Sequence, residues 1–207
     1  MKVIGLTGSI GMGKSTAAAL LRRLGVPVHE ADAAVHRLMG PGGAAVRAIA
    51  TAFPGVVKDG AVDRRLLGAR VFDDDEAMAR LEAILHPLVR EESKRFLRQA
   101  CRRGARVAAL DIPLLFETGR DQDVDASIVV SAPVFVQRAR VLARPGMTPP
   151  RFEQVLARQM PDAEKRLRAD FVVPTGLGRR LTLRRLMSVL KRIEHAHAQG
   201  KRRHRRR

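Results

Sequence analysis

The sequence predicts an α/β domain with a five-stranded parallel sheet flanked by helices. Short apolar runs of strand length alternate with helical patterns, which is typical of a parallel sheet covered by helices. A glycine-rich turn stands between the first run and a helical stretch, and 207 residues are enough to bury a core. The expected strands are Val3–Thr7, Pro27–His29, Val107–Asp111, Ser127–Val130 and Phe171–Val173.

The glycine-rich turn fits the phosphate-binding pattern G-x-x-x-x-G-K-[ST]. Its glycines let the backbone approach an anion closely, and the following helix directs its positive end toward the same place. Lys14 would reach the β- and γ-phosphates of a nucleotide, and the Ser15 hydroxyl would hold Mg²⁺. A chance match in a glycine-bearing turn is the alternative. The expected nucleotide-binding residues are Gly8, Gly11, Met12, Gly13, Lys14, Ser15 and Thr16.

A long segment between the second and third runs, about residues 33–105, predicts a helical insertion. Apolar residues recur in it at helical spacing, from Leu66 to Leu97. Two glycine- and proline-bearing turns interrupt it, one at residues 40–43 and one at residues 53–55. We expect His86-Pro87 to break the long helical stretch, because proline removes a backbone donor and disfavours helical geometry in the residue before it.

An arginine-bearing helix–turn–helix, about residues 136–165, lies between the last two expected strands. In a phosphoryl-transfer enzyme such a hairpin would be a lid that closes over the polyphosphate. Arg138 and Arg144 are its candidate contacts to the nucleotide. The alternative is an ordinary solvated helical face. Residues 1–195 would thus form a single domain with an insertion and a lid.

The net charge of +18 is concentrated at the end of the chain. Residues 176–207 hold twelve Lys and Arg residues against one acid, Glu194, a charge of +11. We expect residues 196–207 to be a disordered basic tail that binds nucleic acid only weakly, if at all. A single cysteine, Cys101, and the lack of a membrane-length apolar stretch predict a cytoplasmic protein.

The phosphate loop indicates a nucleotide but leaves the function class open. The sequence lacks the N-K-x-D segment with which Ras-like GTPases normally recognise guanine. A small chain with a helical insertion and an arginine-bearing hairpin favours a small-molecule kinase. The alternatives are a nucleoside or nucleotide kinase of similar fold and a nucleotide-regulated nucleic-acid-binding protein acting through the basic tail.

The sequence closely resembles the dephospho-coenzyme A kinase family from about Lys2 to Ile193. The phosphate loop is shared with many kinases, whereas the His-Pro step and the Pro-Leu-Leu-Phe-Glu segment at these separations are more specific. The matching segments, in chain order, are Gly5–Thr16, Ala31-Asp32, Asp63-Arg64 with Phe72 downstream, Leu85–Leu88, Asp111–Glu117 and Arg158–Met160.

The resemblance implies a P-loop kinase fold and ATP-dependent phosphorylation of the ribose 3′-hydroxyl of dephospho-coenzyme A, the last step of coenzyme A synthesis. ATP and Mg²⁺ are the implied cofactors, and a monomer or small homo-oligomer is expected. By the same resemblance, Arg64 and His86 line the acceptor-binding section. Arg138 and Arg144 are the lid residues that we expect to contact the phosphates or adenine of ATP.

Two carboxylates follow expected strands and are candidates for the chemistry. Asp32 would orient the acceptor hydroxyl and accept its proton, with helix capping as the alternative. Asp111 ends the third run and would hold Mg²⁺ indirectly, through a water molecule, or else cap the turn at Pro113. We rank Asp111 below Asp32 as the base.

Two departures from the family pattern stand out. Glu30-Ala31-Asp32 replaces the usual Asp-Ala-Asp, and the second acid is kept. The last strand runs into Pro174, where the family commonly has an aspartate. That segment lies toward the adenine in relatives, so adenine binding is the property most open to change.

Overall fold

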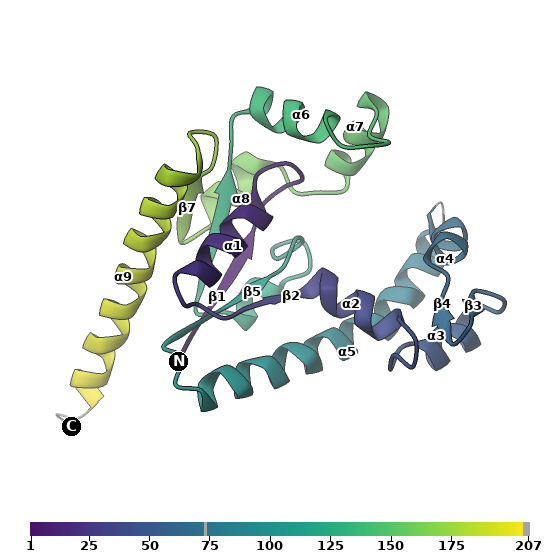
Figure 1. Cartoon of the computed structure of the whole chain (residues 1–207), viewed down its shortest axis with the longest axis horizontal. Helices are drawn as coiled ribbons and strands as arrows, with labels where there is room; N and C mark the ends of the chain where they lie inside the picture. The colour runs from purple at the N-terminus through teal and green to yellow at the C-terminus, as the bar shows by residue number, and fades with distance from the viewer. Residues whose placement is uncertain (73, 205–207) are drawn as a thin grey trace. The chain divides into compact units, whose positions relative to one another are not determined.

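The computed structural model describes residues 1–72 and 74–204, with side chains up to residue 195. The chain divides into two compact units, and Figure 1 labels their elements. The sheet unit comprises Met1–His29 and Ala100–Arg207, and the insertion unit comprises Glu30–Gln99. The predicted insertion of about residues 33–105 therefore corresponds to a compact body of its own.

The sheet unit is built on five parallel strands in the order β2-β5-β1-β6-β7, which confirms the predicted fold class. Every residue of β5 is buried, so the strand sequences read as continuous apolar runs rather than as an alternation. Central β1 pairs with β5 on one side and β6 on the other. The strands are β1 (Lys2–Thr7), β2 (Val28–Glu30), β5 (Val107–Asp111), β6 (Ala126–Ser131) and β7 (Phe171–Pro174).

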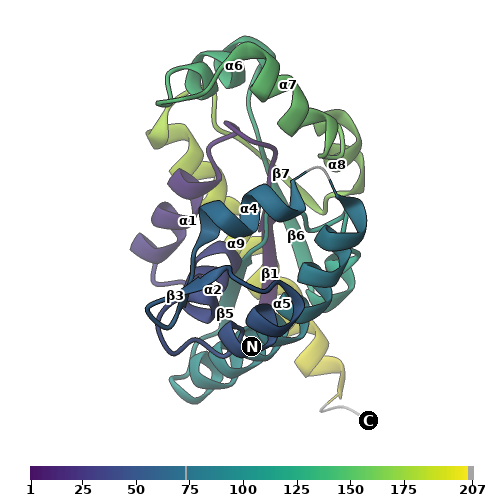
Figure 2. The same ribbon diagram turned by 90° about the vertical axis from the view of Figure 1, so that its right-hand side faces the viewer.

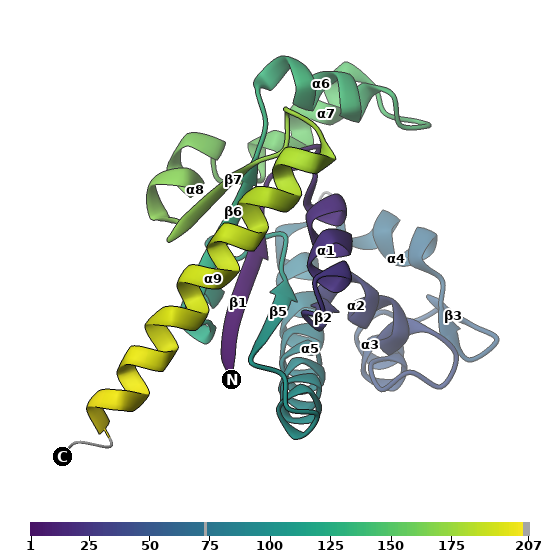
Figure 3. The same ribbon diagram turned by 60° about the vertical axis from the view of Figure 1, so that its left-hand side comes forward.

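Helices flank this sheet. Helices α1 (Lys14–Arg23) and α9 (Arg179–His204) pack side by side on one face, where their apolar residues join Ile4 and Leu6 in a single core (Figure 3). The side of β1 opposite Ile4 and Leu6 is covered by Leu115, which lies so close to Gly5 that a Cβ there would be 2.9 Å from it.

The expected lid is a helical hairpin of α6 (Val134–Leu142) and α7 (Pro149–Ala157), shown in Figure 2. The Thr148 hydroxyl caps α7, and prolines occupy its first turn, where a missing N–H costs nothing. Helix α8 (Asp162–Arg168), whose start falls within the predicted lid of residues 136–165, instead packs against β6. The hairpin itself is therefore shorter than the sequence predicted. A 3₁₀ turn, Arg120–Asp123, precedes β6.

The insertion unit has its own apolar core and contains a feature that the sequence prediction missed. It contains a two-stranded antiparallel hairpin, whose turn is Asp59-Gly60 with positive φ at both residues. Asp-Gly between apolar residues is a hairpin signal, and it was available in the sequence. The elements are α2 (Ala31–Met39), α3 (Val46–Ala52), β3 (Val57–Lys58), β4 (Ala61–Val62), α4 (Arg64–Val71) and α5 (Asp75–Arg102).

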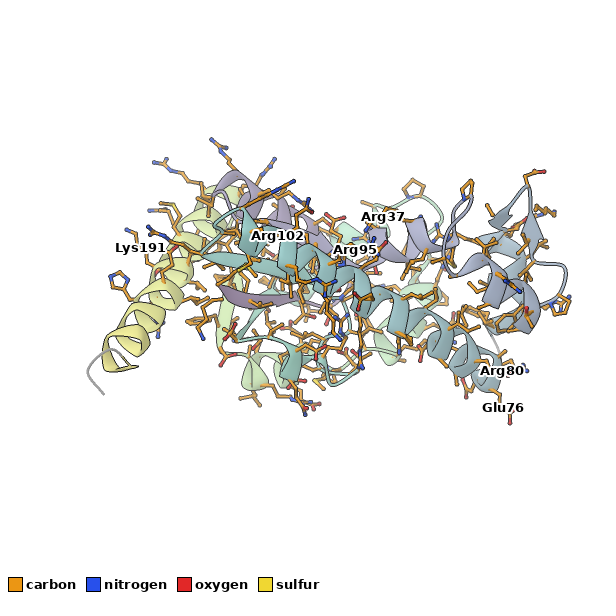
Figure 4. The ribbon with its side chains drawn as sticks, turned by 90° about the horizontal axis from the view of Figure 1, so that it is seen from below. Arg37, Glu76, Arg80, Arg95, Arg102 and Lys191 are labelled. Atoms are coloured by element: carbon orange, nitrogen blue, oxygen red, sulfur yellow. The ribbon has the colours of Figure 1, made fainter. Side chains whose placement is uncertain are left out.

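The expectation that His86-Pro87 breaks the helical stretch is wrong. Figure 4 shows α5 as one unbroken helix, with Glu76 and Arg80 near one end and Arg102 near the other. Burial of Leu81, Leu85 and Val89 on one face stabilises the helix on both sides of the proline. That packing outweighs one missing hydrogen bond.

The end of the chain also differs from the expected disordered tail. Helix α9 continues to His204, so its backbone includes most of residues 196–207, and residues 205–207 lie outside the described part. Within the described residues, no helix is both long and apolar enough to span a membrane.

Asp125 stabilises the start of β1 by accepting two hydrogen bonds, from Lys2 Nζ and the Val3 N–H, each at 2.7 Å. Partial burial opposes ionisation, but these bonds outweigh it and lower the pKa of Asp125. The resulting stabilisation is present above the ordinary aspartate pKa and is lost as pH falls through the lowered value. We expect Asp125→Asn to lower the free energy of unfolding at pH 7 by about 0.5–1 kcal/mol, after allowing for solvent screening.

Urea unfolding from pH 7 down to about pH 3 measures this effect. The difference between the two proteins should shrink as pH falls. An equal difference at every pH would contradict the ionic contribution.

Candidate active site

The phosphate-binding loop lies between β1 and α1, and its backbone geometry requires glycine at two positions. Gly11 and Gly13 have φ of 78° and 88°, a left-handed conformation that other residues rarely adopt. A Cβ on Gly11 would also lie 2.5 Å from Val141 Cγ2, and one on Gly13 would lie 3.0 Å from Thr175 Oγ1. At both positions, a side chain would strain the backbone and would also collide with neighbouring atoms.

The start of α1 is arranged to receive an anion. Gly13 is its N-cap, no side chain caps it, and its first turn contains no acidic residue. By contrast, the Asp63 carboxylate caps α4 and the Thr148 hydroxyl caps α7. The first N–H groups of α1 and the positive end of its dipole are thus left for a ligand, as phosphate binding requires.

Lys14 and Asp111 form an ion pair beside this loop, with 2.5 Å between Lys14 Nζ and Asp111 Oδ1. Asp111 ends β5 opposite Leu6 of β1, so the sheet register brings it to the edge from which the loop leaves. Its side chain is 5% exposed and that of Lys14 is 18% exposed. A buried carboxylate thus holds the lysine where an incoming phosphate can compete for it.

Ser15 and Asp111 supply the oxygen donors that suit Mg²⁺. Ser15 is exposed in the first turn of α1, where its hydroxyl is accessible. Among the described side chains, no group of three or more His, Cys, Asp or Glu residues could hold a metal ion. Mg²⁺ usually binds one or two protein oxygens together with substrate phosphates and water.

The outward side of the loop is held by side chains that the sequence prediction did not select. Thr175, directly after β7, donates from Oγ1 to the Met12 carbonyl at 2.6 Å. Arg140 of α6 donates to the Gly11 carbonyl at 3.4 Å, and also to Thr175 Oγ1 at 3.1 Å and to its carbonyl oxygen at 2.8 Å. The Met12 side chain is buried, and its sulfur accepts from the Ala132 N–H, so Met12 can offer a nucleotide only its backbone.

Arg138 and Arg144 are exposed, Arg138 on α6 and Arg144 just after that helix. The arginine that reaches the phosphate loop is instead Arg140, which the sequence prediction did not select. Arg140 lies three residues after buried Gln137 and next to buried Val141, on the inward face of α6. The sequence alone does not identify that face, because the apolar Val134 and Phe135 of the same helix are exposed.

The other predicted residues belong to the insertion unit. Asp32 is exposed in the first turn of α2, two residues after β2 ends, and Glu30 rather than Asp32 holds the cap position. Arg64 begins α4, with its NH1 3.1 Å from His36 Nδ1. His86 is exposed on α5 directly before Pro87. The sequence analysis did not select His36. Its contact with Arg64 joins residues 28 positions apart, and only the folded insertion unit brings them together.

A parallel sheet in this strand order, with a phosphate loop leading into a helix and an arginine-bearing hairpin after β6, defines a P-loop kinase. Comparison with known proteins narrows the class. The chain belongs to the dephospho-CoA kinase family, whose model matches residues 2–176.

Close relatives support this assignment over most of the chain. A dephospho-CoA kinase from Paramagnetospirillum magneticum is 64% identical over 166 residues, covering 80% of this chain and 78% of the relative. One from Rhodospirillum rubrum is 59% identical over 191 residues, covering 91% and 90%. The family assigned from sequence motifs is confirmed, and with it an enzyme of the last step of coenzyme A synthesis. The two alternative functions are not favoured.

Solved structures share the fold. TT1252 from Thermus thermophilus has a TM-score of 0.77 and 39% identity, over 91% of this chain and 95% of that one. Dephospho-CoA kinase from Campylobacter jejuni has a TM-score of 0.61 and 24% identity, over 93% and 97%. Shikimate kinase from Acinetobacter baumannii, at a TM-score of 0.51 and 19% identity over 93% and 94%, shares the fold alone.

The threonine behind the loop gives a test of this geometry. Thr175→Val removes the hydroxyl that donates to Met12 and accepts from Arg140 but keeps the branched shape. Without its donor the Met12 carbonyl favours other loop conformations in the free protein, and restoring the binding conformation would cost about 1–2 kcal/mol of the ATP binding energy. We therefore expect the ATP dissociation constant to rise about tenfold. Calorimetric titration with ATP measures it.

Thr175→Ser is the matched control, because it keeps the hydroxyl and loses only a methyl group. It should bind ATP within about threefold of the parent protein. Equal weakening by both substitutions would assign the effect to packing instead of the hydrogen bond.

Proposed function

We propose that this chain transfers the γ-phosphoryl group of ATP to the ribose 3′-hydroxyl of dephospho-coenzyme A, with Lys14 and Asp32 as its central residues. The observation that carries this proposal is the uncapped start of α1 together with Lys14 held beside it by Asp111. Family membership supplies the acceptor, which the phosphate loop alone does not specify.

The donor nucleotide would bind through the phosphate loop. The N–H groups at the start of α1 would receive the β-phosphate, and Lys14 would exchange its contact with Asp111 for the transferring phosphate. Ser15 would hold Mg²⁺, with Asp111 as a second holder through water. The ion would neutralise charge on the β- and γ-phosphates when bound.

Asp32 is the proposed base. The carboxyl ends of parallel strands are where open α/β sheets bind ligands, and Asp32 follows β2 by two residues. Its carboxylate would orient the 3′-hydroxyl and accept its proton as the oxygen attacks phosphorus and ADP leaves. Because the transition state of phosphoryl transfer is loose, orientation should contribute more than basicity.

Charged side chains in both units would bind the rest of the substrates. Arg64 and His86 are proposed to contact the acceptor, where the guanidinium would suit its pyrophosphate. Arg138 and Arg144 are proposed to contact ATP once the α6–α7 hairpin closes over it. We further propose a cytoplasmic enzyme, a monomer or small homo-oligomer, that touches nucleic acid at most weakly through its basic end.

Turnover assays with purified protein test the reaction and its two central residues. ATP consumption is compared for dephospho-coenzyme A, adenosine, AMP, CMP and pantothenate. We expect selective turnover with dephospho-coenzyme A, and a loss of about 100-fold or more in kcat for both Lys14→Ala and Asp32→Asn. Lys14→Ala should also weaken ATP binding, whereas Asp32→Asn should not.

Asp59→Asn is the matched control for Asp32→Asn, because it makes the same change in the exposed hairpin turn of the same unit. It should leave turnover unchanged. Full activity of Asp32→Asn would remove Asp32 from the chemistry. Selective turnover with another acceptor would overturn the proposed substrate.

Metal dependence is tested separately. Chelation with excess EDTA should abolish turnover, and Mg²⁺ should restore it, because the ion is needed to neutralise the transferring phosphate. Ser15→Ala should raise the Mg²⁺ concentration needed for half-maximal rate. Turnover that persists in EDTA would contradict a role for the ion.

A further inference from the structure

Both backbone polar groups of Ile10, at the tip of the phosphate loop, are bound by glutamine side chains. The Ile10 N–H donates to Gln159 Oε1 at 3.0 Å. The Ile10 carbonyl accepts from Gln137 Nε2 at 2.8 Å. One glutamine therefore acts as acceptor and the other as donor to a single residue of the loop.

These glutamines stand at the two connections between the α6–α7 hairpin and the sheet. Gln137 lies in the first turns of α6, which begins after β6 ends at Ser131. Gln159 lies between the end of α7 and the start of α8. The tip of the phosphate loop is thus tied to both ends of the hairpin.

The Gln159 connection is fixed to the sheet by its neighbours. The Met160 N–H donates to Glu117 Oε1 at 3.0 Å, and the same oxygen lies 2.7 Å from Lys165 Nζ. The Lys165 side chain is completely buried, and its ammonium is also 3.5 Å from the Pro113 carbonyl. The backbone next to Gln159 is therefore hydrogen-bonded to a largely buried ion pair, which helps to fix its position.

A cavity of about 930 Å³ lies between the two connections, with Gln137, Gln159 and Ser9 in its lining. Its wall includes Ser131–Pro133 from the first connection and residues 159–161 from the second. Both glutamines line this cavity, and their bonds to Ile10 attach the hairpin to the loop beside it.

We propose that Gln137 and Gln159 are positioning residues that couple the α6–α7 hairpin to the phosphate loop and hold Ile10 so that the next N–H groups face the nucleotide. This inference rests on the proposed function, because it assigns ATP to that loop. The two bonds have opposite polarity, and the coupling can therefore be tested by one substitution made at both sites.

A Gln→Glu change keeps the shape and an acceptor oxygen but removes the N–H donor. At position 159 the bond from the Ile10 N–H survives, whereas at position 137 the donor to the Ile10 carbonyl is lost. Both changes place one negative charge beside the same loop residue, Ile10. Gln154→Glu, exposed on α7, is the control for added charge on the hairpin.

ATP affinity by calorimetry, and kcat and KM for each substrate, are measured for the three full-length variants. We expect Gln137→Glu to raise the ATP dissociation constant and KM about tenfold, with the KM for dephospho-coenzyme A unchanged. Gln159→Glu should stay within about threefold of the parent and Gln154→Glu within about twofold. The difference between the first two should persist in 0.5 M KCl, since salt screens an added charge more than a lost hydrogen bond.

Gln137→Met removes the bond to the Ile10 carbonyl and Gln159→Met removes the bond from the Ile10 N–H, in each case without adding charge. Each should raise the KM for ATP. A merely structural role would lower Tm and leave that KM unchanged, which would overturn the proposal. Equal effects of the two Glu variants would overturn it as well. A further outcome is that the protein does not turn over dephospho-coenzyme A while Gln137→Glu still weakens ATP binding more than Gln159→Glu does. That result would overturn the proposed function but support the coupling between the hairpin and the phosphate loop.

Discussion

A loop that directs its N–H groups toward an anion directs its carbonyl groups the other way, and buried carbonyls need donors. In this protein the carbonyls of Ile10, Gly11 and Met12 each receive one, from Gln137, Arg140 and Thr175 respectively. The start of α6 and the segment after β7 are therefore parts of the phosphate site although neither needs to touch a phosphate. The glycines allow this close approach, because a side chain at Gly11 would collide with α6.

Much of the fold could be predicted because its signals are local. The five strands are short apolar runs, and the phosphate loop is a contiguous pattern whose glycines, lysine and serine have fixed spacing. The residues behind the loop could not be predicted in the same way. Thr175 is 163 residues from Met12 in the sequence, and only the packed sheet brings its hydroxyl to that carbonyl. Choosing Arg140 over Arg138 and Arg144 requires knowing which face of α6 is buried.

The insertion unit shows how tertiary packing overrides local preference. A proline inside a helix predicted a break, yet α5 continues because buried residues lie on the same face before and after Pro87. The Asp-Gly turn was the opposite case, a clear local signal within a segment that looked helical throughout. The roles of Asp32, Arg64 and His86 come from family resemblance, since exposure alone does not distinguish a substrate-binding side chain from a solvated one.

Pro174, which departs from the family pattern, lies on the edge strand β7. Thr175 donates its N–H to the Ser131 carbonyl, so Thr175 faces β6 and the backbone nitrogen of Pro174 faces away from the sheet. The pairing with β6 therefore loses no hydrogen bond. On the unpaired side of β7, however, proline removes a backbone N–H to which a strand of another chain could bind. In a crowded solution this makes β7 a poor template for sheet extension, so proline at this position guards against aggregation.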